Sequence, residues 1–246
     1  MTSEDAFQWT SAGISVVGKI RTINEDAFAD LPDTGLWVVA DGMGGHDAGD
    51  FASQAVVESL KQIGPQPRLS VFIDEVENRL LQVNQALIEE AEKREEPTTI
   101  GSTVVAILAV QNYCACLWAG DSRAYRLRDG LMQPVSQDHS QVEEMIEQGL
   151  LLREDAESHP AANVITRAVG AAEELFVDVE LVELQDGDRF LLCSDGLFKE
   201  VSEPEIAQHM QRGSCRDICN DLVGLALERG SRDNVTVVAI DFNKVI

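Results

Sequence analysis

The chain has 246 residues, of which 44% are hydrophobic, enough to bury a large core in one folded unit. Its 43 acidic residues outnumber 19 basic ones and give a formal net charge of -24 at pH 7. Such a charge opposes binding to nucleic acid, whose phosphates require a basic surface, and binding to an anionic membrane. We therefore expect a single domain over residues 1–246, a self-repelling monomer that binds neither nucleic acid nor membrane.

The start of the chain, Met1 to Ala6, lacks the cationic and apolar segments of a signal peptide. The longest apolar runs have the length of strands and are too short to cross a membrane. The chain has five cysteines, and an odd number without secretory features indicates reduced thiols. The sequence therefore predicts a cytoplasmic protein.

Hydrophobic patterning predicts a series of short strands rich in Val, Ile, Leu and Cys. The predicted strands cover residues 8–17, 35–41, 101–110, 113–120, 123–128, 175–184, 188–194 and 234–242. Tight turns at Gln111-Asn112 and Asp186-Gly187 are expected to connect neighbouring strands. Much of the predicted sheet is therefore antiparallel.

Helical periodicity occupies the intervals between these strands. Residues 69–94 carry apolar side chains three or four positions apart, and residues 47–62 form another helix after a glycine-rich turn. Ser202 and Ser214 each precede an acidic residue by three positions, which is typical of helix N-termini. Strand pairs separated by helical pairs favour an α+β architecture. The polar segment 138–165 is predicted to be a flap over one end of the sheet.

Four aspartates lie at the ends of wholly apolar strands. Asp41, Asp121 and Asp195 each follow such a strand, whereas Asp233 precedes one. Because an antiparallel strand begins where its neighbours end, all four can meet at one edge, where each close pair of charges costs on the order of 3 kcal/mol. An Asp-Gly turn explains any one of them more simply, but four together favour bound cations. Clustered oxygen ligands select hard ions such as Mg2+ or Mn2+.

Two divalent ions bridged by one carboxylate are suited to hydrolysis at phosphorus. Such ions supply hydroxide at neutral pH and stabilise the charge that develops during an in-line displacement. The site then needs an arginine, because the planar guanidinium matches two phosphate oxygens. Arg21, just before the acidic pair Glu25-Asp26, is the best candidate.

Seven short motifs occur in the order and spacing of one protein family. They are Arg21-x-x-Asn24-Glu25-Asp26, Asp41-Gly42-Met43-Gly44-Gly45-His46, Gly101-Ser102-Thr103, Gly120-Asp121-Ser122-Arg123-Ala124, Asp138-His139-Ser140, Asp195-Gly196 and Ser231-Arg232-Asp233-Asn234-Val235-Thr236. Together they strongly resemble the PPM family of metal-dependent protein phosphatases, also called phosphatase 2C-like. The resemblance covers nearly the whole chain and is that of a bacterial stand-alone catalytic domain.

The resemblance implies a β-sandwich of two antiparallel sheets flanked by helical pairs, a four-layer αββα arrangement. It implies a serine/threonine protein phosphatase in which a water or hydroxide between two Mn2+ or Mg2+ ions attacks the phosphorus in line, without a phosphoenzyme. Proteins that carry phosphoserine or phosphothreonine are then the substrates. The enzyme is expected to reverse a eukaryotic-type serine/threonine kinase in bacterial signalling.

The resemblance also implies which residues bind the metal ions. Asp41 bridges both ions, and the carbonyl oxygen of Gly42 binds one of them. Asp195 and Asp233 are the other direct ligands. Asp121 matches the ligand of a third, weaker ion, which it shares with Asp195.

Further residues receive roles around these ligands. Arg21 matches the arginine that binds the substrate phosphate. Glu25 and Asp26 are implied to hold metal-bound waters, and Asn234 belongs to the same outer layer. His46 matches a Gly-Gly-His position that protonates the leaving alkoxide or positions its donor water, a role suited to a group that titrates near neutrality.

Two other kinds of protein also use clustered aspartates. A calcium-binding module needs a D-x-[DN]-x-[DN]-G loop, which the sequence does not contain. A phosphatase-like protein that has lost catalysis can act as a binding or regulatory scaffold, but every metal-site aspartate is present here. The catalytic interpretation is therefore preferred. His139 and His159 are expected to be structural.

Overall fold

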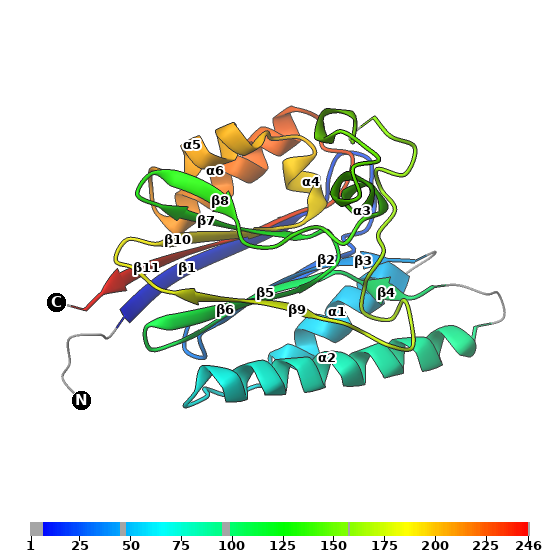
Figure 1. The fold of residues 1–246 in the computed structure, drawn as a ribbon, viewed down its shortest axis with the longest axis horizontal. Helices are drawn as coiled ribbons and strands as arrows, with labels where there is room; N and C mark the ends of the chain where they lie inside the picture. The colour runs from blue at the N-terminus through cyan, green and yellow to red at the C-terminus, as the bar shows by residue number, and fades with distance from the viewer. Residues whose placement is uncertain (1–6, 45–47, 95–98, 157, 246) are drawn as a thin grey trace.

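The computed structural model describes residues 7–44, 48–94, 99–156 and 158–245. Within these residues the strands form two antiparallel sheets that pack face to face, and helices cover the outer face of each sheet (Figure 1). The α+β sandwich that the sequence predicts is therefore confirmed. No helix in the described part of the chain is both long enough and apolar enough to cross a membrane.

One sheet has the strand order β1-β11-β10-β7-β8. Its strands are β1 (Phe7–Val16), β7 (Arg123–Arg128), β8 (Leu131–Pro134), β10 (Arg189–Cys193) and β11 (Val235–Lys244). Its longest ladder joins β1 to β11, so the first and last described strands lie side by side.

The other sheet has the order β2-β3-β5-β6-β9, with the short strand β4 also paired to β3. Its strands are β2 (Asp26–Leu31), β3 (Leu36–Met43), β4 (Gly101–Ser102), β5 (Val104–Val110), β6 (Tyr113–Ala119) and β9 (Asp178–Glu183). The predicted turn at Gln111-Asn112 connects β5 to β6 as an antiparallel hairpin.

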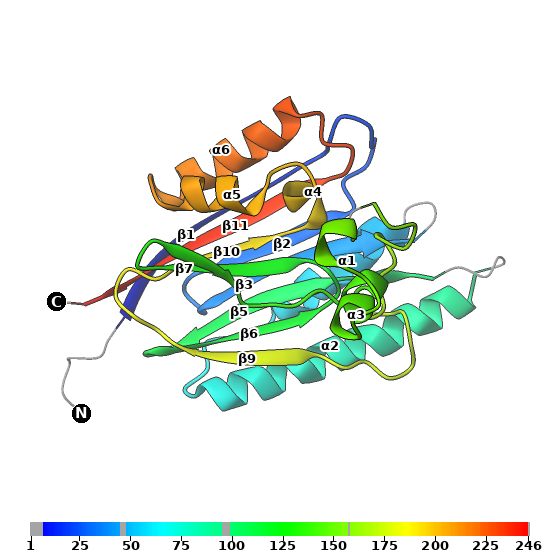
Figure 2. The same ribbon diagram turned by 45° about the horizontal axis from the view of Figure 1, so that its top comes forward.

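Helices α1 (Ala48–Leu60) and α2 (Leu69–Glu92) cover the second sheet, whereas α4 (Asp195–Phe198), α5 (Glu203–Met210) and α6 (Cys215–Glu228) lie over the first (Figure 2). Their buried side chains form an apolar cluster against each sheet. The capping boxes predicted at Ser202 and Ser214 are both present at the starts of α5 and α6. Helix α3 (Gln141–Glu147) lies in the polar segment 138–165, whose ends meet through a bridge between Ser140 and Ile165.

A third apolar cluster fills the space between the two sheets. Trp37 of β3 packs edge-to-face on Phe242 of β11, with ring centroids 5.8 Å apart. Phe242 in turn packs edge-to-face on Phe190 of β10, at 5.5 Å. These rings contribute area burial and favourable edge-to-face geometry, and they fix one sheet relative to the other.

The predicted turn at Asp186-Gly187 does not join neighbouring strands. It leads from β9 in one sheet to β10 in the other, so that prediction is wrong. The turn is held by tertiary bonds: Gly187 donates its amide to the Phe242 carbonyl, and the Asp188 carboxylate accepts from Arg128 of β7. These bonds attach the turn to β7 and β11, the strands with which β10 pairs.

Candidate active site

Five aspartates from both sheets meet at one end of the sandwich. Asp41 lies near the end of β3, and Asp26, the first residue of β2, is its direct neighbour in the ladder. Asp121 follows β6, Asp195 follows β10, and Asp233 precedes β11. The negative charges of the other four all act on Asp41. The predicted convergence of strand-end aspartates is therefore present, with Asp26 as an added member.

Burial, and then the charges of neighbouring carboxylates, raise the pKa of Asp26, Asp41 and Asp121. Desolvation, followed by the charges of Asp26 and Asp195, raises the pKa of Asp41 well above its ordinary value. Burial raises the pKa of Asp26 to about 7, although hydroxyl donors to this carboxylate oppose the shift. Burial and then the charge of Asp195 raise the pKa of Asp121 to about 7. If all of these carboxyls were ionised, the cluster would therefore carry more negative charge than its surroundings neutralise.

The Gly101-Ser102-Thr103 motif fixes the backbone of Asp41. The Thr103 hydroxyl accepts from the Asp41 amide at 3.0 Å, and the Thr103 amide donates to the Asp41 carbonyl at 2.8 Å. The same hydroxyl is 2.7 Å from that of Ser122, the residue after Asp121. One threonine thus links the segments that carry Asp41 and Asp121.

The glycine that follows Asp41, and the one that follows Asp195, are required by close approaches between backbones. A Cβ on Gly42 would lie 1.9 Å from the Gly49 carbonyl oxygen, and one on Gly196 would lie 1.9 Å from that of Asn234. No side chain fits at such distances. Each Asp-Gly pair therefore packs its strand end directly against another segment of the site.

Arg21 reaches the cluster from the exposed loop before β2. Its guanidinium donates to Asp233 Oδ2 at 3.0 Å and lies 3.4 Å from Glu25 Oε2. Asn234 ties this loop down, because its Oδ1 accepts from the Glu25 amide at 2.8 Å and its Nδ2 donates to the Ile23 carbonyl at 3.1 Å. The Arg21 side chain remains 48% exposed, so a ligand in solvent can reach it.

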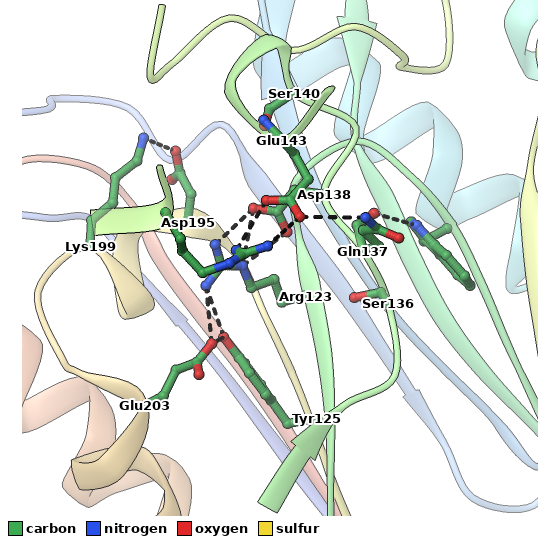
Figure 3. Close-up of polar contacts among 12 residues, drawn as sticks. Arg123, Tyr125, Ser136, Gln137, Asp138, Ser140, Glu143, Asp195, Lys199 and Glu203 are labelled. Carbon is green, nitrogen blue, oxygen red and sulfur yellow. Dashed lines mark hydrogen bonds and ion pairs between the residues drawn. The ribbon is translucent and has the colours of Figure 1, made fainter. Parts of the chain in front are cut away.

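Lys199 is a member of the site that the sequence analysis did not identify. It follows α4, and its ammonium pairs with Asp195 Oδ2 (Figure 3). The sequence feature that could have indicated this pair is the spacing of four positions between Asp195 and Lys199, which suits an ion pair on one helical turn. The other oxygen, Asp195 Oδ1, is buried and has no hydrogen-bond partner among the described residues.

Arg123 and Asp138 connect the site to the segment 138–165. The Arg123 guanidinium donates in a bidentate fashion to Asp138, at 2.9 and 2.8 Å (Figure 3). The same guanidinium lies 3.7 Å over the ring of Phe198. It also lies 3.5 Å from Glu203 of α5. The start of the predicted flap is therefore held against α4 and α5 by one planar cation.

His139 has the structural role expected from the sequence. Its Nδ1 accepts from the Gly120 amide at 3.2 Å, so its Nε2 carries the proton and donates to Asp178 at 3.1 Å. The ring stacks on Trp118, and desolvation lowers its pKa, which favours the neutral form. These contacts fix the backbone just before Asp121.

A cavity of about 550 Å³ opens beside the aspartates, between segment 138–165 and the α4–α5 region. Its wall includes Asp121, Lys199 and Phe198 on the side of the site and Arg153 on the side of the segment. His46, the candidate proton donor, lies outside the described residues.

Divalent ions suit this arrangement of donors. Among the described residues, no group of three acidic, histidine or cysteine side chains is placed to hold an ion as it stands. Arg21 and Lys199 are instead paired with two of the carboxylates. The uncompensated charge, the all-oxygen donors and the buried, unpartnered Asp195 Oδ1 nevertheless match what a hard cation requires.

Comparison with known proteins identifies the family. The sequence model for Protein phosphatase 2C matches residues 20–220, and the chain belongs to this family. A serine/threonine phosphatase, stp, of Listeria innocua is 33% identical over 234 residues, which cover 92% of this chain and 93% of that protein. The chain is accordingly a protein serine/threonine phosphatase.

Solved structures agree with this assignment. PppA of Pseudomonas aeruginosa, described as a key regulatory component of the T6SS, has a TM-score of 0.88 and 42% identity, over 95% of this chain and 97% of that one. A PstP catalytic domain in complex with two manganese ions has a TM-score of 0.86 and 33% identity, over 96% and 99%. The enzyme therefore depends on divalent metal ions.

Proposed function

We propose that Asp41, Asp195, Asp233 and the Gly42 carbonyl hold two Mn2+ or Mg2+ ions, and that this site hydrolyses phosphoserine and phosphothreonine in proteins. The observation that carries the proposal is the buried excess of carboxylate, which raises the pKa of Asp41 and leaves Asp195 Oδ1 without a partner among the described residues. When bound, two such ions supply hydroxide at neutral pH and stabilise charge on the phosphoryl oxygens.

Arg21 is proposed to bind and orient the substrate phosphate. Its guanidinium stays charged, because the bond to Asp233 raises its pKa further, and about half of the side chain is open to solvent. The neighbouring acids hold it at the mouth of the site without burying it. This placement lets one side chain align the phosphoryl group for in-line attack.

Direct attack by water, with no phosphoenzyme, is part of the proposal, and the state of the cysteines argues against one alternative, a cysteinyl-phosphate intermediate. All five lie within the described residues and are buried and unbonded to one another. Burial raises the pKa of Cys193, next to the site, to about 12, so a thiolate nucleophile is disfavoured.

The remaining assignments complete the proposal. Glu25 and Asp26, with Asn234 behind them, hold ordered waters around the ions, and Asp121 shares a third, weaker ion with Asp195. His46 protonates the leaving alkoxide or positions its donor water. Residues 1–246 form one cytoplasmic, monomeric domain whose flap, residues 138–165, contacts substrate, and the enzyme opposes a eukaryotic-type serine/threonine kinase.

The test is hydrolysis of p-nitrophenyl phosphate and of a phosphothreonine peptide with Mn2+, with and without chelator. We expect turnover that chelator abolishes, and a loss of orders of magnitude in Asp233→Asn with the fold intact. Asp33→Asn, in the exposed turn between β2 and β3, is the matched control and should keep full activity. Absence of turnover with every divalent ion would instead favour a scaffold that has lost catalysis.

A further inference from the structure

The Lys199 ammonium lies beside carboxylates that could also bind a metal ion from solvent. We propose that this ammonium competes with the third divalent ion for Asp195 and Asp121 and thereby sets that ion's affinity. The inference rests on the proposed function, because it assumes that the two-metal core forms beside it. Lys199 is in this sense a positioning residue that regulates metal occupancy.

The local fold directs Lys199 toward Asp195. The Lys199 amide donates to the Asp195 carbonyl at 3.0 Å, which closes one helical turn and places the two side chains on the same face of α4. The ammonium pairs with Asp195 Oδ2, and the Asp195 side chain is only 13% exposed. The Lys199 side chain is 40% exposed, so the pair is shielded from water mainly on the side of Asp195.

Asp121 faces the same space as Lys199. Both residues line the cavity of about 550 Å³ beneath segment 138–165, and Asp121 is 7% exposed. The positive charge of Lys199 acts on Asp121 and Asp41 as well as on Asp195. One ammonium thus offsets part of the charge of three converging carboxylates.

The two oxygens of Asp195 have different surroundings, which divides their roles. Oδ1 is buried and has no partner in the described part of the chain, so it remains for an ion of the two-metal core. Oδ2 is contacted by Lys199. A third ion shared by Asp195 and Asp121 must displace the ammonium from Oδ2 or bind beside a like charge, and either event weakens it.

The experiment measures Mn2+ binding to the full chain from the electron paramagnetic resonance signal of free Mn2+. We expect two tight Mn2+ sites in the unsubstituted chain and in each variant. The third site should bind Mn2+ with an affinity higher by roughly tenfold or more in Lys199→Met than in the unsubstituted chain. Lys199→Arg, which keeps the charge, should leave the third site weak. Lys61→Met, which removes an exposed lysine paired with Glu58 on α1, controls for the change in net charge.

Lys199→Gln repeats the test with a polar side chain, in case Lys199→Met folds poorly. An unchanged third-site affinity in a folded Lys199 variant, with both tight sites intact, overturns the competition and leaves the proposed function standing. Equal tightening in Lys61→Met also overturns it, because the effect is then one of net charge. Absence of the two tight sites in the unsubstituted chain overturns the proposed function itself.

Discussion

The two ends of the sandwich differ in how the charge of their aspartates is compensated. At the end away from the site, Asp188 is 1% exposed and accepts two bonds from Arg128, at 2.7 and 2.6 Å, and one from the Gln185 amide at 2.9 Å. Asp241 of β11 is likewise paired with Arg189 of β10. Asp188 and Asp241 thus each have an arginine partner, which neutralises their charge within the fold.

At the other end, the same residue type is gathered without equal compensation. Burial and mutual repulsion raise the pKa of Asp26, Asp41 and Asp121. The two ends therefore give aspartates two different roles within one fold. An aspartate paired with an arginine links strands, whereas an aspartate crowded by other carboxylates is suited to bind an external cation.

The largest effect expected from this comparison is on catalysis. Asp41→Asn should reduce kcat/KM for p-nitrophenyl phosphate by roughly a thousandfold or more, about 4 kcal/mol in activation free energy. The metal-free variant should melt at the same temperature as the unsubstituted chain or higher, because one repelling charge is gone. Calorimetry in chelator measures the melting temperature, and a marked fall would show that Asp41 supports the fold rather than the metals.

At the end away from the site, substitutions should lower the free energy of unfolding. Arg128→Met leaves the Asp188 carboxylate buried without its partner, and we expect unfolding in urea to require about 3–5 kcal/mol less. Activity per folded molecule should be retained. Arg189→Met provides a graded comparison, because the Asp241 side chain is 19% exposed and the Asp188 side chain is not exposed at all. The smaller loss is expected there, and equal losses would mean that burial of the acid does not decide the cost.

The pH dependence of stability should also reflect the carboxyl groups at the site. The pKa of both Asp26 and Asp121 is about 7 in the fold against 3.8 ordinarily, so the folded state binds protons more tightly than the unfolded state. Their contribution to stability is therefore present at low pH and is lost between about pH 4 and pH 7, by on the order of 1 kcal/mol per pH unit for each carboxyl.

Urea unfolding in chelator at pH 5, 6, 7 and 8 measures this slope, and Asp121→Asn should flatten part of it. Mn2+ affinity should rise over the same interval, because the ions require ionised carboxylates. Stability of the metal-free protein that increases from pH 5 to pH 7 would contradict the raised pKa values.

The smallest effect should come from the hydroxyls that partly compensate Asp26. Its Oδ2 accepts from Ser194 at 2.7 Å and from Thr236 at 2.6 Å. Ser194→Ala removes one of two donors, and we expect a loss of about 1 kcal/mol in the free energy of unfolding. Thr236→Val should cost a similar amount. A loss as large as that of Arg128→Met would mean that the hydroxyls neutralise Asp26 as fully as an arginine neutralises Asp188.

Sequence patterning could predict the cluster because each candidate aspartate lies at one end of an apolar run. Asp41 and Asp195 end such runs, and antiparallel pairing brings strand ends together regardless of the details of packing. Strand β2 was missed because Asp26 and Asp30 interrupt its apolar pattern. Both carboxylates accept hydroxyl or indole bonds from other segments, which no local pattern reveals.

Contacts that depend on tertiary structure could not be predicted in the same way. Helix α4 has only four residues, too few for a periodic signal, so the pairing of Lys199 with Asp195 was not foreseen. The turn at Asp186-Gly187 has the residues of a hairpin, but a turn does not encode which sheet its second strand will join. The second strand instead pairs with β7 and β11, and Asp188 next to the turn bonds Arg128, sixty positions earlier in the chain.

The pairing of β1 with β11 has a consequence for how the chain folds. These ten-residue strands form one ladder although more than two hundred residues separate Phe7 from Lys244. Closing such a long loop is entropically costly and slows folding, and a ribosome must deliver residues 235–244 before the ladder can form. Asp233 lies two residues before that strand, so the proposed metal site can be completed only after this late segment has been synthesised.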